Sequence, residues 1–351
     1  MGAFHSAVRT YYGDASEDVT VEHGVAIVAT GGQEWRGDVF LLGQDERVVT
    51  ALDLEEIIVH QPERITGLKE VVFIQCVGRS AEGGEVEYCS RTCCTNTMKN
   101  AIRIKMLNPN CRVVVLYKDI ITYGFREEFY TEARRRGVLF VRYDDAHMPQ
   151  VRVDDQGRLE LVAWESSLQQ GIVLHPDLLS LSMAIQPSVG TKELAHILDV
   201  PLSSEGFFLE DHVKMRPMDF TKEGIFVCGL AHYPKFIGEC ITNAQAAAGR
   251  AVTILSTPQM YIGGVISVVD QSRCVGCLTC VRTCPFTIPK VRYEDMGVGE
   301  IRGAAYIDPA VCTGCGTCTA ECPAKAIQLV AYRDEQIMGL PLGAWAVIDE
   351  Q

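Results

Sequence analysis

Short apolar runs alternate with segments of helical periodicity in the first half of the chain. Runs rich in Val, Ile, Leu and Phe occupy residues 69–78, 111–117 and 138–143 and are typical of buried strands. The segments between them, 95–110 and 126–137, place apolar residues at helical spacing, and the first ends at an Asn-Pro pair. This order of strand, helix, strand, helix and strand predicts a parallel α/β layer.

Further apolar runs predict elements outside this layer. Residues 21–32 form a short strand-like run that closes in a Thr-Gly-Gly turn, and residues 151–164 alternate around a Gly-bearing turn as in a β-hairpin. Residues 177–185 and 224–230 resemble buried strands, and the alanine-rich segment 241–255 is predicted to be a helix. Beyond these elements the chain changes to cysteine-rich turns, so we expect a domain boundary near residue 262.

The chain of 351 residues contains 15 cysteines, and most of them are clustered. Eight lie in one C-terminal region, four in an earlier region and three elsewhere. The odd count and the absence of a signal-peptide pattern argue against a disulfide framework and favour metal binding in a cytoplasmic protein. The formal net charge of −13 makes nucleic acid and anionic membrane poor partners.

The C-terminal cysteines form the same motif twice. CVGCLTCVRTCP at 274–285 recurs as CTGCGTCTAECP at 312–323, at an offset of 38 residues. This C-x2-C-x2-C-x3-C-P spacing is that of bacterial ferredoxins, in which the fourth cysteine of each motif binds the other cluster. A pair of zinc sites is disfavoured, because zinc needs neither the third C-x2 step nor the C-P ending. The expected ligands are Cys274, Cys277, Cys280 and Cys322 for one [4Fe-4S] cluster, and Cys312, Cys315, Cys318 and Cys284 for the other.

The earlier group consists of Cys76, Cys89, Cys93 and Cys94. Its spacing matches no common zinc pattern, and by itself it leaves cluster ligation and buried or redox-active thiols as open alternatives. Cys76 ends an apolar strand, whereas Cys93 and Cys94 open a predicted helix, whose N-terminal dipole favours thiolates.

Five segments together resemble HdrA, the iron–sulfur flavoprotein family of heterodisulfide reductases. They are FIQCVGRS, YCSRTCC, the ATGG turn, GLAHYPKFIGE and the double ferredoxin motif, and the resemblance extends from about residue 21 to about residue 330. It implies an α/β flavoprotein fold like that of thioredoxin reductase, with an incomplete FAD domain and an inserted nucleotide-binding-like domain, followed by a bacterial 2[4Fe-4S] ferredoxin domain. It also implies that the C-x12-C-x3-C-C group, Cys76, Cys89, Cys93 and Cys94, holds a third [4Fe-4S] cluster.

The resemblance divides the chain into five parts. Residues 1–64 and 186–262 would form the FAD domain, and residues 65–185 the inserted domain that carries the four-cysteine group. Residues 263–335 would be the ferredoxin domain and residues 336–351 a C-terminal tail.

The resemblance also implies residues that face FAD. A turn before the insertion and a loop after it would lie against the cofactor, since glycine lets the backbone approach it. Lys99, five positions after Cys94, matches the family's lysine beside the flavin ring and is the catalytic candidate, although it could also be an exposed helix lysine. The implied flavin-facing residues are Thr30, Gly31, Gly32, Lys99, Gly229, Leu230, Ala231, Lys235, Phe236 and Ile237. His175, His212 and His232 lie in no recognisable catalytic pattern.

The sequence also departs from a complete flavoprotein. No G-x-G-x-x-G precedes Ala29, although FAD pyrophosphate needs that element in this fold. We therefore expect a split subunit, in which a separate N-terminal HdrA-like half supplies the segment and shares the FAD. The first turn of the inserted domain, QCVGRSAEGGE, lacks a nicotinamide fingerprint, and no C-x-x-C follows it before the ferredoxin motifs, so NAD(P)H binding and thioredoxin-type chemistry are not expected.

The leading hypothesis is an electron-transfer subunit of a cytoplasmic heterodisulfide-reductase-like complex with FAD and three [4Fe-4S] clusters. The resemblance implies HdrB- and HdrC-like or other oxidoreductase subunits and ferredoxin as partners, and flavin-based electron bifurcation or confurcation. Two alternatives remain open. One is an NAD(P)H-dependent iron–sulfur flavoenzyme acting on a small molecule, and the other is a flavin-free ferredoxin-like carrier.

Overall fold

The computed structural model separates the chain into two compact units. The smaller comprises Met1–Ala26, Lys222–Gly224 and Ala251–Gln351, and the larger Ile27–Thr221 and Ile225–Arg250. The residues that the structure describes are 4–13, 15–79, 86–165, 169–256, 265–309, 311–333 and 335–339. No helix in these ranges is both long and apolar enough to cross a bilayer.

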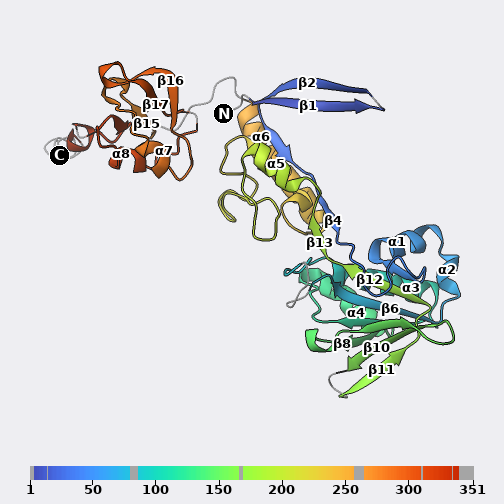
Figure 1. Ribbon diagram of the computed structural model, residues 1–351. Coiled ribbons are helices and arrows are strands. Elements are labelled where there is room, and N and C mark those ends of the chain that lie inside the picture. Colours follow the sequence, from blue (N-terminus) through green and yellow to red (C-terminus); the bar gives the residue numbers. More distant parts are fainter. Residues whose placement is uncertain are drawn as a thin grey trace. The chain divides into compact units, whose positions relative to one another are not determined.

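A five-stranded parallel sheet forms the centre of the larger unit (Figure 1). Its order is β5 (Val48–Thr50), β12 (Leu178–Met183), β6 (Glu70–Val77), β7 (Arg112–Tyr117) and β8 (Leu139–Arg142), and all four pairings are parallel. Every residue of β6 and β12 is buried, as expected of parallel strands that are covered on both faces. The predicted parallel α/β layer is confirmed.

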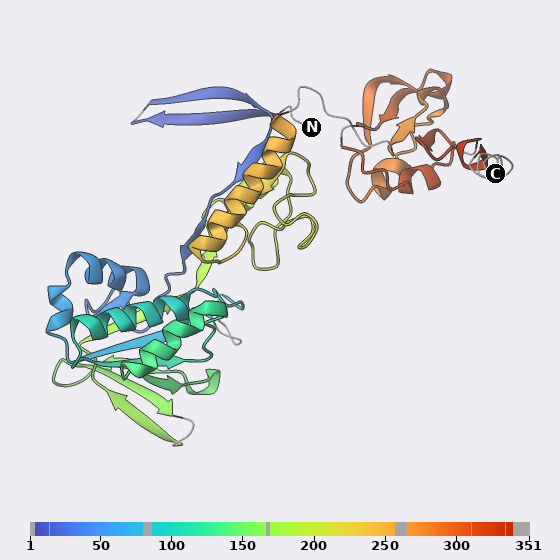
Figure 2. The same ribbon diagram turned by 180° about the vertical axis from the view of Figure 1, so that it is seen from behind.

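Helices cover one face of this sheet (Figure 2). They are α1 (Ala51–His60), α2 (Glu63–Thr66), α3 (Cys93–Leu107) and α4 (Glu127–Arg135). Helix α1 begins at a capping box, in which the Thr50 hydroxyl accepts the Asp53 amide proton and the Asp53 carboxylate accepts that of Thr50. The expected helices at 95–110 and 126–137 are therefore present as α3 and α4.

A second, antiparallel sheet packs on the other face. It has the order β11 (Gln170–Leu174), β10 (Leu159–Glu165) and β9 (Gln150–Val153). Because side chains alternate along a strand, Phe73 of β6 packs among the helices, whereas Ile74 packs against the β10 side. The predicted hairpin at 151–164 is confirmed as β9 and β10.

Short strand pairs and a long helix lie wholly or mostly in the larger unit. Strand β4 (Gly32–Glu34) pairs antiparallel with β13 (Ile185–Pro187), and β3 (Ala26–Val28) pairs with β14 (Ile225–Val227). The remaining helices are α5 (Thr191–Leu198) and α6 (Ile237–Leu255). The short 3-10 turns of the chain are η1 (Gly124–Arg126), η2 (Asp145–His147), η3 (Gly229–Ala231), η4 (Gln271–Arg273) and η5 (Val298–Glu300).

The run expected as one strand at 21–32 is divided in the structure. Its first residues end β2 (Ala15–His23), which forms an antiparallel hairpin with β1 (Phe4–Tyr12), and β3 follows separately. Nearly all of β2 is exposed, so its polar alternation reflects a strand with solvent on both faces and not a strand buried in a sheet.

The C-terminal cysteine-rich part is built from two similar halves. Strand β15 (Ser267–Val269) pairs with β18 (Ile327–Leu329), and β16 (Lys290–Met296) pairs with β17 (Arg302–Tyr306). The short helices α7 (Thr279–Thr283) and α8 (Thr317–Ala320) begin five residues after the first cysteine of each motif. Residues 38 positions apart also share unusual backbone conformations. Leu278 and its equivalent Gly316 have φ of 63° and 77°, and Thr287 and its equivalent Lys325 have φ of 52° and 50°.

Candidate functional site

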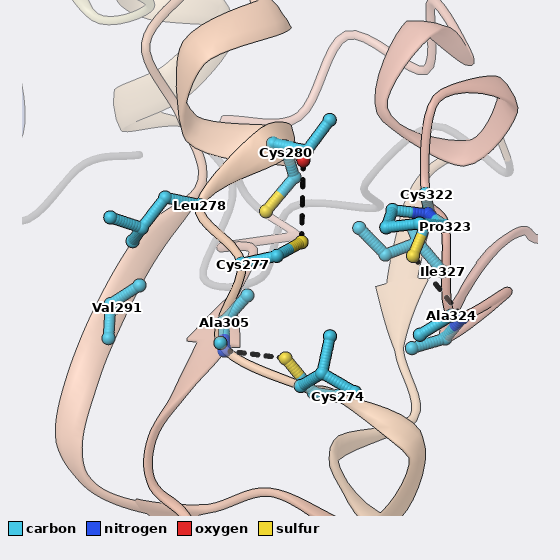
Figure 3. Close-up of a pocket in the computed structure, with 14 residues that line it drawn as sticks. Cys274, Cys277, Leu278, Cys280, Val291, Ala305, Cys322, Pro323, Ala324 and Ile327 are labelled. Carbon is cyan, nitrogen blue, oxygen red and sulfur yellow. Dashed lines mark hydrogen bonds between the residues drawn. The ribbon is translucent and has the colours of Figure 1, made fainter.

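Four cysteines from both ferredoxin-type motifs line one pocket (Figure 3). Cys274, Cys277 and Cys280 come from the first motif, and Cys322 comes from the end of the second. The backbone N–H of Ala305 lies 3.4 Å from the sulfur of Cys274, and that of Ala326 lies 3.3 Å from the sulfur of Cys322. Such bonds favour the thiolate that iron requires. The structure thus gathers the residues expected to bind the first cluster.

The second expected set is gathered next to the first. Burial raises the pKa of Cys318, a hydrogen bond with the Ser267 hydroxyl lowers it, and the nearby thiolates of Cys312, Cys284 and Cys315 raise it further. Cys284, from the end of the first motif, therefore lies close enough to Cys318 to act on its pKa, as do Cys312 and Cys315 of the second motif. Cys318 in turn acts on the pKa of Cys280, which burial raises to about 11, so the two sets are neighbours.

The four cysteines of the earlier group also lie together. Cys76 is the last but one residue of β6, Cys93 and Cys94 are the first residues of α3, and Cys89 lies in the loop between these elements. Burial raises the pKa of Cys76, and the thiolates of Cys94 and Cys89 raise it further. A hydrogen bond between Cys93 and Cys94 raises the pKa of the first and lowers that of the second. The strand, the loop and the helix therefore bring four sulfurs to one place.

The surroundings of this group fit a cationic metal centre. Four cysteine sulfurs gathered in a largely buried site could lose their protons together only if a positive charge compensated them, which the iron of a cluster would supply. Cys76 has φ = 59° and Arg91 has φ = 62°, the left-handed region that non-glycine residues rarely adopt and that is concentrated at functional sites. These observations favour cluster ligation over the alternative of isolated buried thiols.

Arg91 connects the four-cysteine group to a loop far along the chain. Its backbone N–H lies 3.3 Å from the Cys89 sulfur. Its guanidinium donates to the Tyr123 hydroxyl at 2.9 Å, to the Glu239 carboxylate at 3.3 Å and to the Pro234 carbonyl at 3.5 Å. Sequence reasoning missed Arg91, and the available signal was an arginine placed between two ligand cysteines.

The two backbone segments implied to face FAD are adjacent. A Cβ atom added at Gly32 would lie 3.6 Å from the Leu230 Cβ and 3.1 Å from the Gln186 carbonyl oxygen. Gly31 and Gly229 have φ of 77° and 66°, which glycine adopts without strain. The structure thus joins the Thr30–Gly32 turn to η3, and the Thr30 carbonyl accepts a hydrogen bond from Ser188.

Lys235 lies inside the loop that follows η3. Its side chain is 3% exposed, and its ammonium bonds to Asn243 and lies 3.2 Å from His232 Nδ1. Burial lowers the pKa of Lys235 to about 8. His232 Nε2 lies 2.7 Å from the Glu210 carboxylate, so a buried chain of polar groups supports this loop.

The other two implied residues of this loop differ in exposure. Phe236 packs beneath the Arg126 guanidinium, 3.7 Å from the ring centre, whereas Ile237 is 81% exposed. Ile237 therefore offers an apolar surface at the start of α6, and Phe236 is held within the protein.

Lys99 lies in a different environment. Its ammonium pairs with Glu55 of α1 at 2.7 Å, and the lysine is half-exposed. It lines a groove of about 350 Å³ with Ile58, Met106 and Phe129, and none of the lining residues belongs to the turn or to the loop implied to face FAD. The structure does not bring Lys99 together with those segments, and its role beside a flavin stays a prediction.

A carboxylate and histidine group forms a further cluster. Ligand atoms of Asp154, Glu160 and His175 lie within 4.8 Å of one another. Arg158 pairs with the Asp154 carboxylate at 2.9 Å, and Arg152 pairs with Glu160. The two arginines compensate the acidic charge, so ion pairs explain this cluster.

Known proteins share these cysteine motifs. Residues 273–326 match the family described as 4Fe-4S dicluster domain. The chain is 35% identical over 349 residues to the HdrA subunit of the H(2)/formate:CoB-CoM heterodisulfide,ferredoxin reductase of Methanococcus maripaludis, an alignment that covers 95% of this chain and 52% of that protein. It is 36% identical over 345 residues to the iron-sulfur HdrA subunit of the CoB--CoM heterodisulfide reductase of Methanocaldococcus jannaschii, covering 93% and 51%. The chain is HdrA-like.

This HdrA-like chain spans about half the length of the curated relatives that it matches. Among solved structures it is similar to the thioredoxin reductase of T. acidophilum, with 13% identity, a TM-score of 0.46 and 69% of each chain covered. The C-terminal 4Fe-4S dicluster domain expected from the double motif is confirmed by the family match.

Proposed function

We propose that this HdrA-like chain is an electron-transfer subunit of a heterodisulfide-reductase-like oxidoreductase complex. Its dicluster domain would work with a third [4Fe-4S] cluster on Cys76, Cys89, Cys93 and Cys94 and with FAD. Such groups exchange electrons singly at the clusters and as pairs at the flavin. The observation that carries the proposal is the four-sulfur group tied by Arg91 to the loop after η3.

The residues of this chain have separate tasks in the proposal. Gly31 of the turn and Gly229 of η3 leave space for close approach by a cofactor, since an added Cβ atom at either would meet nothing within 4 Å. The Arg91 guanidinium holds the Glu239 end of α6 beside the cysteine loop, which would keep the proposed cluster at a constant distance from that helix. Burial of Cys76 and Cys94 excludes water from the cluster ligands.

The partners are part of the same proposal. The 351 residues contain no G-x-G-x-x-G, so the segment that binds the FAD pyrophosphate would come from an N-terminal HdrA-like half outside them. HdrB- and HdrC-like or other oxidoreductase subunits, and ferredoxin, would exchange electrons with the chain. The proposal also includes electron bifurcation or confurcation at the flavin of this complex, which would be cytoplasmic.

Cofactor analysis after anaerobic purification tests the proposal. The chain should be prepared alone and together with an HdrA-like N-terminal segment that carries a G-x-G-x-x-G element. We expect about 12 iron atoms per chain, as for three four-iron clusters, and FAD in the joint preparation. About eight iron atoms without flavin in either preparation would favour the flavin-free carrier, and rapid flavin reduction by NADPH would favour the nicotinamide-dependent enzyme.

A further inference from the structure

Backbone hydrogen bonds to cysteine sulfur recur at equivalent positions of the 38-residue repeat in the two ferredoxin-type sites. In the first site the Ala305 N–H lies 3.4 Å from the sulfur of Cys274. In the second site the Ser267 N–H lies 3.4 Å from the sulfur of Cys312. Ser267 and Ala305 are equivalent in the repeat, as are Cys274 and Cys312, so two equivalent positions donate to two equivalent cysteines at the same distance. Backbone hydrogen bonding therefore does not distinguish these two ligands.

The side chains at these positions do distinguish the sites. The Ser267 hydroxyl lies 3.4 Å from the sulfur of Cys318 and 3.5 Å from the Thr319 hydroxyl. Ser267 is 2% exposed. At the first site the equivalents of Ser267 and Thr319 are Ala305 and Val281, so hydrocarbon replaces both hydroxyls. Cys318 thus has a buried hydroxyl neighbour, and the repeat gives its counterpart Cys280 none at this position.

A hydroxyl in this position acts on the charge of the cluster. A ligated sulfur carries no proton, so only Ser267 can donate in the pair, and Thr319 can donate to the serine oxygen and orient the serine proton. Reduction adds one negative charge, and a hydrogen bond to a cluster sulfur stabilises that charge and raises the reduction potential. The effect is largest where water is excluded.

Two positively charged side chains near the first site would raise the reduction potential of the first cluster and so oppose the effect of Ser267, but both are exposed. Arg282 and Lys325 lie on the segments that carry Cys280 and Cys322, and both side chains are open to solvent. Water and salt screen exposed charges, whereas the buried Ser267 hydroxyl lies directly against a ligand. The Thr313 hydroxyl also bonds with Cys315 where the first site has Val275, but Thr313 is exposed, so Ser267 is the buried difference in hydrogen bonding between the sites.

We propose that Ser267 raises the reduction potential of the cluster held by the second motif, so that an electron on the dicluster domain resides there in preference to the first cluster. The exchange moves one electron. The first cluster is oxidised by one electron as the second is reduced by one, and no bond or proton changes. Thr319 is a positioning residue. The inference rests on the proposed electron-transfer function and assigns an order to its two C-terminal sites.

A redox titration followed by electron paramagnetic resonance tests this order in the full chain with its clusters. The signal of the second cluster is identified by its change in Cys315→Ser. Ser267→Ala should lower the potential of that cluster alone and shift the electron distribution about tenfold towards the first, which corresponds to 59 mV for one electron. Thr319→Val should give a smaller shift in the same direction.

Ala305→Ser is the matched control, because it places a hydroxyl at the equivalent position of the first site. It should raise the potential of the first cluster, and the double variant with Ser267→Ala should reverse the order. Unchanged potentials in Ser267→Ala and Ala305→Ser would overturn the inference. Should Ser267→Ala lose iron, Thr319→Val and Ala305→Ser still decide it. Loss of the flavin or of the third cluster would contradict the proposed function and leave both dicluster potentials measurable.

Discussion

The Arg91 guanidinium lies 3.3 Å from the Glu239 carboxylate, 148 positions away in the sequence. The backbone of the same arginine donates to Cys89, so one residue joins a ligand loop to the start of α6. Glu239 also accepts the Phe236 N–H at 2.8 Å, which orders the turn into that helix. The position of the four-cysteine group is thus coupled to the loop after η3.

Replacing Arg91 tests this coupling. Arg91→Ala removes charge-assisted bonds to Tyr123 and Glu239, and it should lower the free energy of unfolding by about 1–3 kcal/mol. It should also alter the paramagnetic resonance signal of the third cluster and leave the dicluster signals unchanged. Arg136→Ala is the control, since Arg136 and Glu132 are both more than one third exposed and their pair should contribute at most about 1 kcal/mol. Equal effects of the two variants would contradict the coupling.

The ligand role of the earlier cysteines predicts a discrete change in iron content. Cys76→Ser should reduce the iron from about 12 to about eight atoms per chain, because one four-iron cluster is lost. Chemical analysis of iron and sulfide measures this change. Cys240→Ser, at a partly buried thiol outside the three ligand groups, should retain all the iron. An unchanged iron content in Cys76→Ser would remove the third cluster from the proposal.

The contact between the turn and η3 predicts a steric requirement at Gly32. The Cβ atom of Gly32→Ala would lie 3.1 Å from the Gln186 oxygen and 3.2 Å from the Ile185 Cγ2, so β4 and β13 must separate. We expect a loss of about 1–3 kcal/mol in unfolding free energy, the usual cost of overpacking, together with weaker FAD retention.

Gly249→Ala serves as the control for Gly32→Ala. Gly249 lies inside α6, and nothing within 4 Å would meet its added Cβ atom. The change should stabilise the chain by up to about 1 kcal/mol, since alanine is the better helix former. Urea unfolding with flavin fluorescence measures both variants, and equal stability of the two would refute the steric requirement.

Lys235 predicts a dependence of stability on pH. Its pKa is lowered from 10.5 to about 8 by burial, so between these values the unfolded chain binds a proton that the folded chain does not. The contribution of Lys235 to stability should therefore increase as pH rises from about 8 to 10.5, by about 3 kcal/mol. Lys235→Met should lack this component in urea unfolding, whereas Lys192→Met, at an exposed lysine of α5, should retain it. Parallel pH profiles of Lys235→Met and the parent would contradict this assignment.

The sequence predicted the strands that are buried throughout and the helices that have one buried side, because burial produces a regular pattern of apolar residues. Strand β6 is buried along its whole length, and α3 and α4 each have an apolar side, so pattern alone located them. The hairpin of β1 and β2 was missed because both strands are largely exposed and carry no buried face. Strand β11 was missed for the same reason, since only Leu174 within it is buried.

The site was predictable where local spacing carries the chemistry. The short intervals between cysteines in the two ferredoxin-type motifs predicted which cysteines lie together. The pocket lined by Cys274, Cys277, Cys280 and Cys322 agrees with the expectation that the fourth cysteine of one motif joins the first three of the other. The contacts of Arg91 and Ser267 were not predictable, because Glu239 and Cys318 meet them only after distant elements pack together. The pairing of Lys99 with Glu55 likewise depends on the packing of α1 against α3.

The presence of Cys322, from the second motif, in the pocket of the first motif has a consequence for the order in which this domain forms. Cys322 reaches a ligand set whose other members belong to the preceding half, and its backbone neighbour Ala326 donates to it from the strand side. Neither half of the C-terminal part can complete this pocket by itself. Under the proposed function, a cluster held by these four cysteines would be inserted only after the later half of the domain has been synthesised, so its presence would report that both halves of the repeat have folded.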